Sequence, residues 1–188
     1  TEHQAFSGFI TGLTDAAHQA WYASLMLNRL MFVYFIQRKG FLDGNANYLA
    51  DRLRQIQDQT GKGHFHSFYR QFLCRLFHEG LNQPKPRPDD LSALIGEVPF
   101  LNGGLFERSD LDAKVDDIDD RAFVDIISPN TPASDGGLFY RYNFTVEEST
   151  PLDIEVAVDP EMLGKVFEEL VTGRHESGSY YTPRPVVT

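Results

Sequence analysis

The clearest pattern in the first half of the chain is a repeat of large apolar residues at the spacing of an α-helix. After Thr14 these residues fall three, four and seven positions apart: Trp21, Leu25, Phe32, Phe35 and Ile36. Thr14 is a suitable N-terminal cap for such a helix, and Gly40 can end it just after Lys39. The pattern therefore predicts one long helix whose aromatic stripe lies in the core.

Two more helices are predicted before the chain changes character. The first covers residues 47–57, ahead of the helix breakers Gly61 and Gly63, and its apolar side consists of Leu49, Leu53 and Ile56. The second covers residues 65–79, with Gly80 as its stop, and its inward side consists of Phe65, Phe68, Phe72, Leu76 and Phe77. Three helices of this kind predict a small bundle.

The pattern weakens at residues 82–88, which read NQPKPRP. Three prolines in this stretch favour an extended connection, and we place a domain boundary here. Beyond it, short helices are predicted over residues 91–95 and 121–127. The alternation in FYRYNFTVEE, residues 139–148, predicts one or two short strands.

A last helix is predicted to start at Asp159, because an aspartate cap followed by Pro160 is a typical helix beginning, and to end near Gly173. The fold class is therefore predicted to be mainly α. It has three parts: a helical bundle over residues 1–81, an extended, acidic, loop-rich connector with short strands over residues 82–157, and a further helix with its sequel over residues 158–188.

The charge of the chain is unevenly distributed. The net charge of −10 argues, taken alone, against a nucleic-acid-binding protein. Residues 28–87, however, hold ten Lys and Arg against four Asp and Glu, whereas residues 88–188 hold seven against twenty-one. Such a basic part fits a surface that faces phosphates, a surface that pairs with the acidic part, or ordinary solvated helices, and charge alone leaves all three open.

If the basic part faces DNA phosphates, its helices supply six candidate contacts: Arg38, Lys39, Arg52, Arg54, Arg70 and Arg75.

The sequence carries few motifs of catalysis or metal binding. The single cysteine, Cys74, excludes an internal disulfide and a four-cysteine zinc site, and its spacing from His78 provides only two ligands, so we expect no metal. No P-loop, dinucleotide-binding loop, nucleophile elbow or nuclease motif occurs. The longest apolar run, residues 30–36, is too short to span a bilayer, and no secretory leader opens the chain. We therefore expect a cytoplasmic protein without a membrane partner.

Three stretches together resemble one family: RLMFVYFIQRKGFL (residues 29–42), VPFLNGGLFE (98–107) and VDPEMLGKVFEELVTGRHESGSYYTPRPVV (158–187). Their order is similar to the region that precedes and enters the methyltransferase domain of type IIG restriction-modification enzymes and their BREX-type phage-defence relatives. The resemblance implies S-adenosylmethionine-dependent methylation of adenine N6 in DNA. The last stretch is the most specific of the three.

The resemblance assigns a role to the GSYYTP stretch, which in that family lies against the bound S-adenosylmethionine. Carried over to this chain, it implies that four residues bind the cofactor: Tyr180, Tyr181, Thr182 and Pro183. The chemistry of these residues agrees with the role. Pro183 favours an extended Thr182 whose hydroxyl can meet a polar ligand, and tyrosine rings can cover an apolar or ring-shaped part of it.

The chain departs from the family pattern because it stops at Thr188, before the glycine-rich cofactor loop and the Asn-Pro-Pro-aromatic motif. We therefore expect a helical connector of a larger enzyme that forms one wall of the cofactor pocket and is inactive alone. Its partners would be double-stranded DNA and neighbouring methylase or nuclease domains. The alternative from the residues themselves is a stand-alone helical protein-interaction module.

The NGGLFE stretch, with Asn102, Gly103 and Gly104, is predicted to form a tight structural turn that packs Phe100, Leu105 and Phe106.

Overall fold

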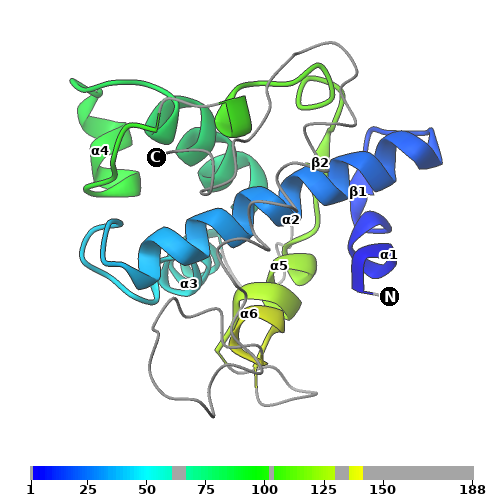
Figure 1. Ribbon diagram of the computed structural model, residues 1–188, viewed down its shortest axis with the longest axis horizontal. Coiled ribbons are helices and arrows are strands. Elements are labelled where there is room, and N and C mark those ends of the chain that lie inside the picture. The colour runs from blue at the N-terminus through cyan, green and yellow to red at the C-terminus, as the bar shows by residue number, and fades with distance from the viewer. Residues whose placement is uncertain (1, 61–66, 102–103, 130–135, 142–188) are drawn as a thin grey trace, which may run out of the picture. The chain divides into compact units, whose positions relative to one another are not determined.

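The fold is mainly α, as predicted, in a computed structural model that describes residues 2–60, 67–101, 104–129 and 136–141 (Figure 1). The predicted helix after Asp159 lies outside these residues. The elements are α1 (Glu2–Ser7), β1 (Ile10–Thr11), α2 (Ala16–Arg38), α3 (Tyr48–Thr60), the π-helical segments η1 (Phe68–Leu73) and η2 (Leu76–Leu81), α4 (Asp89–Ile95), the short 3-10 helix η3 (Gly104–Phe106), β2 (Asp117–Ile118), α5 (Asp120–Ile127) and α6 (Leu138–Arg141).

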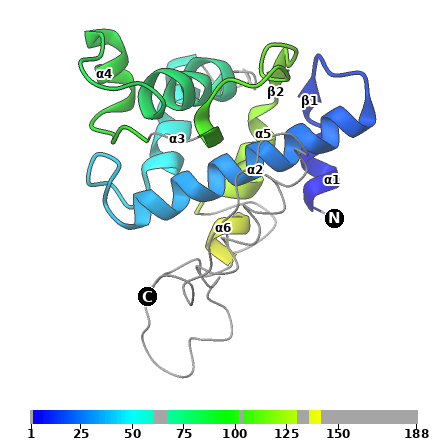
Figure 2. The same cartoon turned by 45° about the horizontal axis from the view of Figure 1, so that its top comes forward.

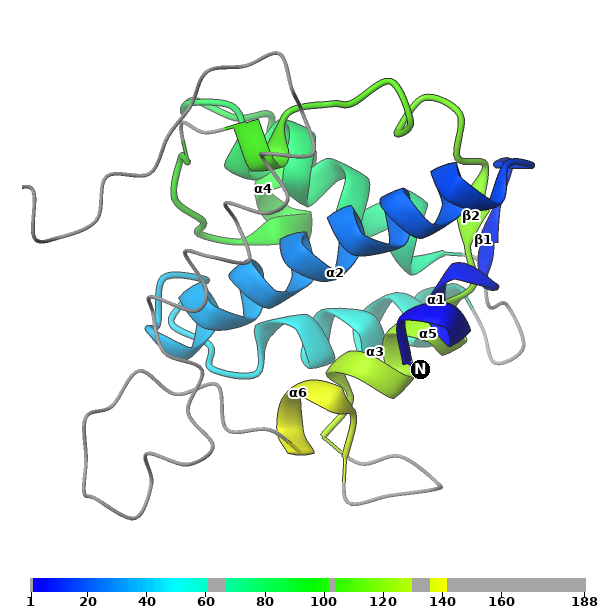
Figure 3. The same ribbon diagram turned by 45° about the vertical axis from the view of Figure 1, so that its right-hand side comes forward.

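Helix α2 crosses the middle of the fold, with α4 and α6 on opposite sides of it in three views (Figures 1, 2 and 3). It is capped by Asp15 rather than by Thr14, because the Asp15 carboxylate accepts a hydrogen bond from the His18 N–H at 2.8 Å. Gly40 ends the helix as predicted. Its φ of 77° favours glycine, and its N–H donates to the Gln37 carbonyl at 2.9 Å.

The predicted core stripe of α2 is wrong for four of its five residues. Only Ile36 is buried, whereas Trp21, Leu25, Phe32 and Phe35 are partly exposed. The buried face runs through Tyr22, Met26, Arg29, Val33 and Ile36. Because α2 has apolar residues on all sides and a charged one on its buried face, periodicity could not identify that face.

The predicted third helix consists of two π-helical segments, η1 and η2, and Gly80 lies inside η2 instead of ending it. A Cβ atom on Gly80 would lie 2.7 Å from Cδ1 of Ile95 in α4, so the glycine allows these two elements to approach closely. Phe68 and Phe72 are buried as predicted, and their rings stack with centroids 5.1 Å apart.

The strand prediction over residues 139–148 is wrong for residues 139–141, which belong to α6, while residues 142–148 lie outside the described part of the chain. Phe139 is buried, and its ring packs on Tyr34 of α2 with centroids 5.0 Å apart. The observed strands are β1 and β2, an antiparallel pair with Ile10 opposite Ile118 (Figure 3). Strands of two residues are too short to show an alternation in the sequence.

Residues 83–88 form neither helix nor strand, as the prolines predict. Arg87 fixes this stretch, because its guanidinium donates to the Gly80 carbonyl at 2.7 Å and the Val98 carbonyl at 3.0 Å. The domain boundaries stay predictions, although the part described through Arg141 belongs to one compact unit. Within this part of the chain, no helix has the length and apolar character that crossing a membrane requires.

Candidate functional site

The four residues predicted to bind the cofactor, Tyr180, Tyr181, Thr182 and Pro183, lie outside the described part of the chain. The described residues include two buried polar centres and several cations at the surface.

The first buried centre surrounds Arg29, in the middle of α2, which is only 1% exposed. Its guanidinium forms a bidentate ion pair with the Asp112 carboxylate, with N···O distances of 2.7 and 3.1 Å. It also donates to the carbonyls of Leu105 and Glu107, both at 2.8 Å, and lies over the ring of Phe77 at 5.5 Å. The buried guanidinium is therefore bound by residues 105–112, a segment that begins with the LFE part of the NGGLFE stretch.

Asp112 is the acceptor at the centre of this network. Besides Arg29, its carboxylate accepts hydrogen bonds from the Tyr22 hydroxyl at 2.7 Å, the Ser109 N–H at 2.7 Å and the Ser109 hydroxyl at 2.8 Å. Burial alone would raise the pKa of Asp112, but the hydrogen bonds and the charge of Arg29 outweigh it and hold that pKa well below its usual range. The carboxylate therefore stays ionised.

Two tyrosines and a histidine complete what we call the Arg29 cluster: Arg29, Asp112, Tyr22, Tyr69 and His78. The hydroxyls of Tyr22 and Tyr69 are 2.7 Å apart, and burial raises the pKa of both phenols. His78 Nδ1 lies 3.1 Å from the carbonyl oxygen of Phe106, while its Nε2 is 3.7 Å from Asp112. Burial lowers the pKa of His78, which favours the neutral ring.

The Arg29 cluster holds residue types that serve in acid–base catalysis, but its members are buried and bonded to one another. It joins α2, η1 and η2 to the segment around Asp112, so its role is to fix that segment. Phe106 confirms the turn prediction in part: it is buried, with its ring 5.5 Å from Phe77. Phe100, in contrast, is 46% exposed, so the prediction that it packs inside is wrong.

Sequence reasoning missed the Arg29 cluster. The one signal was an arginine within an otherwise apolar helix, since a charge on such a helix requires a buried partner. Nothing in the sequence indicated that the partner would be Asp112, which is 83 residues away along the chain.

The second buried centre is Asp120, at the start of α5, which is 0% exposed. Its carboxylate accepts from the N–H groups of Ser67 and Phe68, at 3.2 and 2.9 Å, and from the Ser67 hydroxyl at 3.0 Å. It therefore caps the N-terminal end of η1 from another element of the fold, in the way that a side chain usually caps its own helix.

Three of the six cations predicted to contact DNA have partners that hold them to the fold. Arg70 donates to the Asp116 carbonyl at 2.5 Å and the Val115 carbonyl at 2.8 Å. Arg75 pairs with Asp90 at 2.7 Å and with Glu79 at 3.3 Å.

Arg52 is the third of these held cations. It pairs with Asp43 at 3.2 Å, donates to Gln55 at 2.9 Å and lies over the Tyr48 ring.

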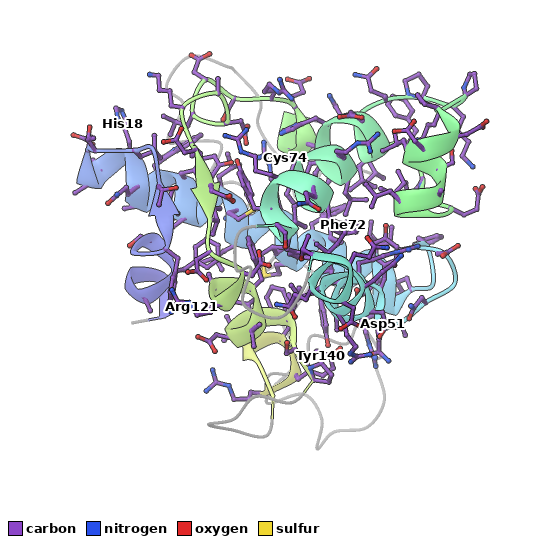
Figure 4. The ribbon with its side chains drawn as sticks, turned by 180° about the vertical axis from the view of Figure 1, so that it is seen from behind. His18, Asp51, Phe72, Cys74, Arg121 and Tyr140 are labelled. Carbon is purple, nitrogen blue, oxygen red and sulfur yellow. The ribbon has the colours of Figure 1, made fainter. Side chains whose placement is uncertain are left out.

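The other three cations lie on the outside. Arg38 and Lys39 are exposed at the C-terminal end of α2, and Arg54 is exposed on α3. Arg54 pairs with Asp51 at 3.3 Å, and both side chains of this pair are largely in solvent, at 63% and 46% exposed. Asp51 and Tyr140 lie on the same side of the fold (Figure 4).

Cys74 is not paired with His78 as a metal site would require. The Cys74 thiol instead interacts with the Tyr69 hydroxyl, and burial raises its pKa. Among the residues that the structure describes, no group of three or more His, Cys, Asp or Glu side chains is arranged to hold a metal ion.

The comparisons with known proteins give one informative similarity. No protein-family model matches the chain, and no solved structure is significantly similar to it. The chain is 29% identical, over 178 residues, to a protein of Methanocaldococcus jannaschii whose name describes a type II restriction enzyme and methyltransferase. The match covers 89% of this chain but 14% of that protein, so the chain is similar to a small part of a much longer polypeptide.

Proposed function

We propose that this chain is a helical part of a DNA methyltransferase of a restriction-modification system. The observation that carries the proposal is the similarity to the M. jannaschii restriction enzyme and methyltransferase along nearly the whole chain. More finely, we propose the type IIG or BREX-type arrangement, with S-adenosylmethionine as methyl donor, adenine N6 as acceptor and double-stranded DNA as the substrate. The cytoplasm, where such DNA lies, is the proposed location.

The described residues support the role of a connector. The Arg29 cluster holds the segment around Asp112 against α2, and Asp120 caps η1, so buried polar contacts join the elements of this part into one scaffold. The side chains of the Arg29 cluster and Asp120 are hydrogen-bonded within the fold. We therefore place the chemistry of methyl transfer in other parts of the parent polypeptide.

For the cofactor, the chemistry of the donor set is suitable. Thr182 provides a hydroxyl, and Tyr180 and Tyr181 provide aromatic surfaces, which match the amino-acid end and the adenine ring of S-adenosylmethionine. When bound, the cofactor supplies an electrophilic methyl group. The role of these residues is to hold and orient it, as one wall of the pocket.

The test is methyl transfer by the parent polypeptide that contains this chain. Incubated with S-adenosylmethionine and duplex DNA, it is expected to produce N6-methyladenine, measured by mass spectrometry of the digested DNA. Thr182→Ala is expected to weaken S-adenosylmethionine binding by about tenfold, the effect of one lost hydrogen bond to a charged ligand. The matched control is Thr14→Ala, an exposed threonine on the described scaffold, which is expected to leave binding unchanged.

Two results would contradict the proposal. Absence of methyl transfer by the folded parent would reject the methyltransferase function, and methylation of cytosine would reject the adenine assignment alone.

One observation favours a second candidate function, a protein-interaction module. Phe41 and Phe100 are large apolar side chains that are 61% and 46% exposed. Binding through such rings would change little with salt, whereas binding to DNA phosphates weakens steeply as salt rises. Measuring how the affinity of the chain for its bound partner changes with salt concentration therefore distinguishes the two functions.

A further inference from the structure

Three of the six cations predicted to contact DNA are already bound to partners within the fold. Arg70 is held by two backbone carbonyls, Arg75 by two acids and Arg52 by Asp43. A cation that is already paired neutralises less phosphate charge, because binding DNA would first require its partner to be displaced. These three residues are therefore weak candidates for contacting DNA.

Arg38 and Arg54 differ from them. Arg38 is exposed, and no acid pairs with it among the described residues. Arg54 pairs with Asp51 alone, and that pair is exposed on both sides, so its free energy is small and a phosphate can displace it.

The tertiary structure brings these two arginines to one place beside Tyr140. The Tyr140 hydroxyl donates to Oδ1 of Asn47, just before α3, at 3.1 Å, and its ring meets Tyr34 of α2 edge-on at 6.0 Å. Arg38 follows Tyr34 by one turn of α2, and Arg54 pairs with Asp51, which lies one turn after Asn47. Burial raises the pKa of Tyr140; the charge of Asp51 adds to that rise, and the charges of Arg38 and Arg54 oppose it. Helix α6 thus contacts both α2 and the residue just before α3.

We propose that Arg38 on α2 and Arg54 on α3, the two helices linked through Tyr140, form a surface that binds the phosphate backbone of double-stranded DNA. Each guanidinium can donate two hydrogen bonds to phosphate oxygens. Contacts of this kind position a protein on the duplex without reading its sequence. The inference rests on the proposed function for its choice of DNA as the partner, and it assigns the contact to this surface rather than to Arg52, Arg70 and Arg75.

The test compares two charge-matched double variants of the 188-residue chain. Arg38→Gln with Arg54→Gln removes the proposed contacts. Arg75→Gln with Lys85→Gln removes two other cations, which pair with Asp90 and Glu97. Binding to a fluorescent duplex of about 20 base pairs is measured by anisotropy over roughly 50 to 200 mM salt, where phosphate contacts dominate the salt dependence.

The first variant is expected to bind duplexes of any sequence more weakly, with a slope of log affinity against log salt reduced by about 2, since each lost phosphate contact removes about 1. The second variant is expected to keep the slope of the unmodified chain. Circular dichroism of both variants verifies that they fold.

Equal weakening of both variants would overturn the proposal, because the binding would then follow net charge and not this surface. Failure of the unmodified chain to bind at the lowest salt would overturn it as well. Neither result affects methyl transfer by the parent, which is measured separately, so the proposed function and this surface fail independently.

Discussion

At the scale of the residue, Arg29 shows what burying a charge requires. Its guanidinium is satisfied by one carboxylate and two backbone carbonyls, and the carboxylate in turn by Tyr22 and Ser109. A buried ion pair contributes little net stability, but removing one partner leaves the other charge unpaired in a medium of low polarity. The network therefore determines where Asp112 lies against α2, and it adds little to the net stability of the fold.

Asp112→Ala is expected to lower the free energy of unfolding by about 3 to 5 kcal/mol, because Arg29 would be left buried without its counter-ion. The control is Asp51→Ala, which removes the exposed partner of Arg54 and is expected to cost about 0 to 1 kcal/mol. Urea denaturation of both variants measures the difference. Similar losses in the two variants would show that Asp112 is not held in a buried pair.

The same carboxylate should make stability depend on pH. The pKa of Asp112 is lower in the folded chain than its ordinary value of 3.8, so in acid the unfolded chain takes up a proton first. Its stabilisation is complete above that value and is lost as the pH falls below it. The unmodified chain should therefore lose stability below about pH 4 more steeply than the Asp112→Ala variant.

At the scale of the element, η1 and α2 begin in different ways. The start of α2 is capped locally: the Asp15 carboxylate accepts a hydrogen bond from the N–H of His18, three residues later. The start of η1 is capped by Asp120, 52 residues after Phe68. A cap that comes from another element couples the formation of η1 to the docking of α5.

Asp120→Ala is expected to lower the free energy of unfolding by roughly 2 to 4 kcal/mol, because two buried N–H groups and a hydroxyl lose their acceptor. Asp15→Ala, which removes an exposed cap, is expected to cost about 1 kcal/mol. Asp120→Asn should fall between them, since its amide oxygen can still accept from the two N–H groups of η1. Thermal or urea unfolding of the three variants gives the order, and an equal effect of Asp120→Ala and Asp15→Ala would contradict the coupling.

At the scale of the whole molecule, the uneven charge of the sequence has a structural counterpart. Within the described part of the chain, three ion pairs join Lys or Arg of residues 28–87 to acids beyond residue 88: Arg29 with Asp112, Arg75 with Asp90, and Lys85 with Glu97. Of the three explanations that charge leaves open, pairing of the two parts is therefore confirmed for these residues. The phosphate-facing explanation applies, as a proposal, to the arginines beside Tyr140.

The 188-residue chain alone is expected to transfer no methyl group to DNA. Its sequence contains no Asn-Pro-Pro motif to receive an adenine, and the side chains of the Arg29 cluster are hydrogen-bonded within the fold. Incubation with S-adenosylmethionine and duplex DNA, followed by mass spectrometry, measures this, with the parent polypeptide as the positive control. N6-methyladenine produced by the chain alone would contradict the proposed role as a connector.

Much of the secondary structure follows from the sequence. The positions of α2, α3, α4 and α5 were predicted to within a few residues, because helical spacing, caps and glycines act between near neighbours along the chain. The mainly α fold follows from the same local signals. The strand pair and the π-helical form of η1 and η2 do not, because they depend on which segments meet.

What the sequence determined by itself is thus the helical content, the uneven charge and the resemblance of its motifs to a methyltransferase family. The tertiary structure alone decided which face of α2 is buried, which acid neutralises Arg29 and which arginines stay on the surface. The physical reason is that the free energy of a charge depends on its distance from water and from other charges. That distance is fixed by contacts between residues as far apart as Arg29 and Asp112, which no local pattern encodes.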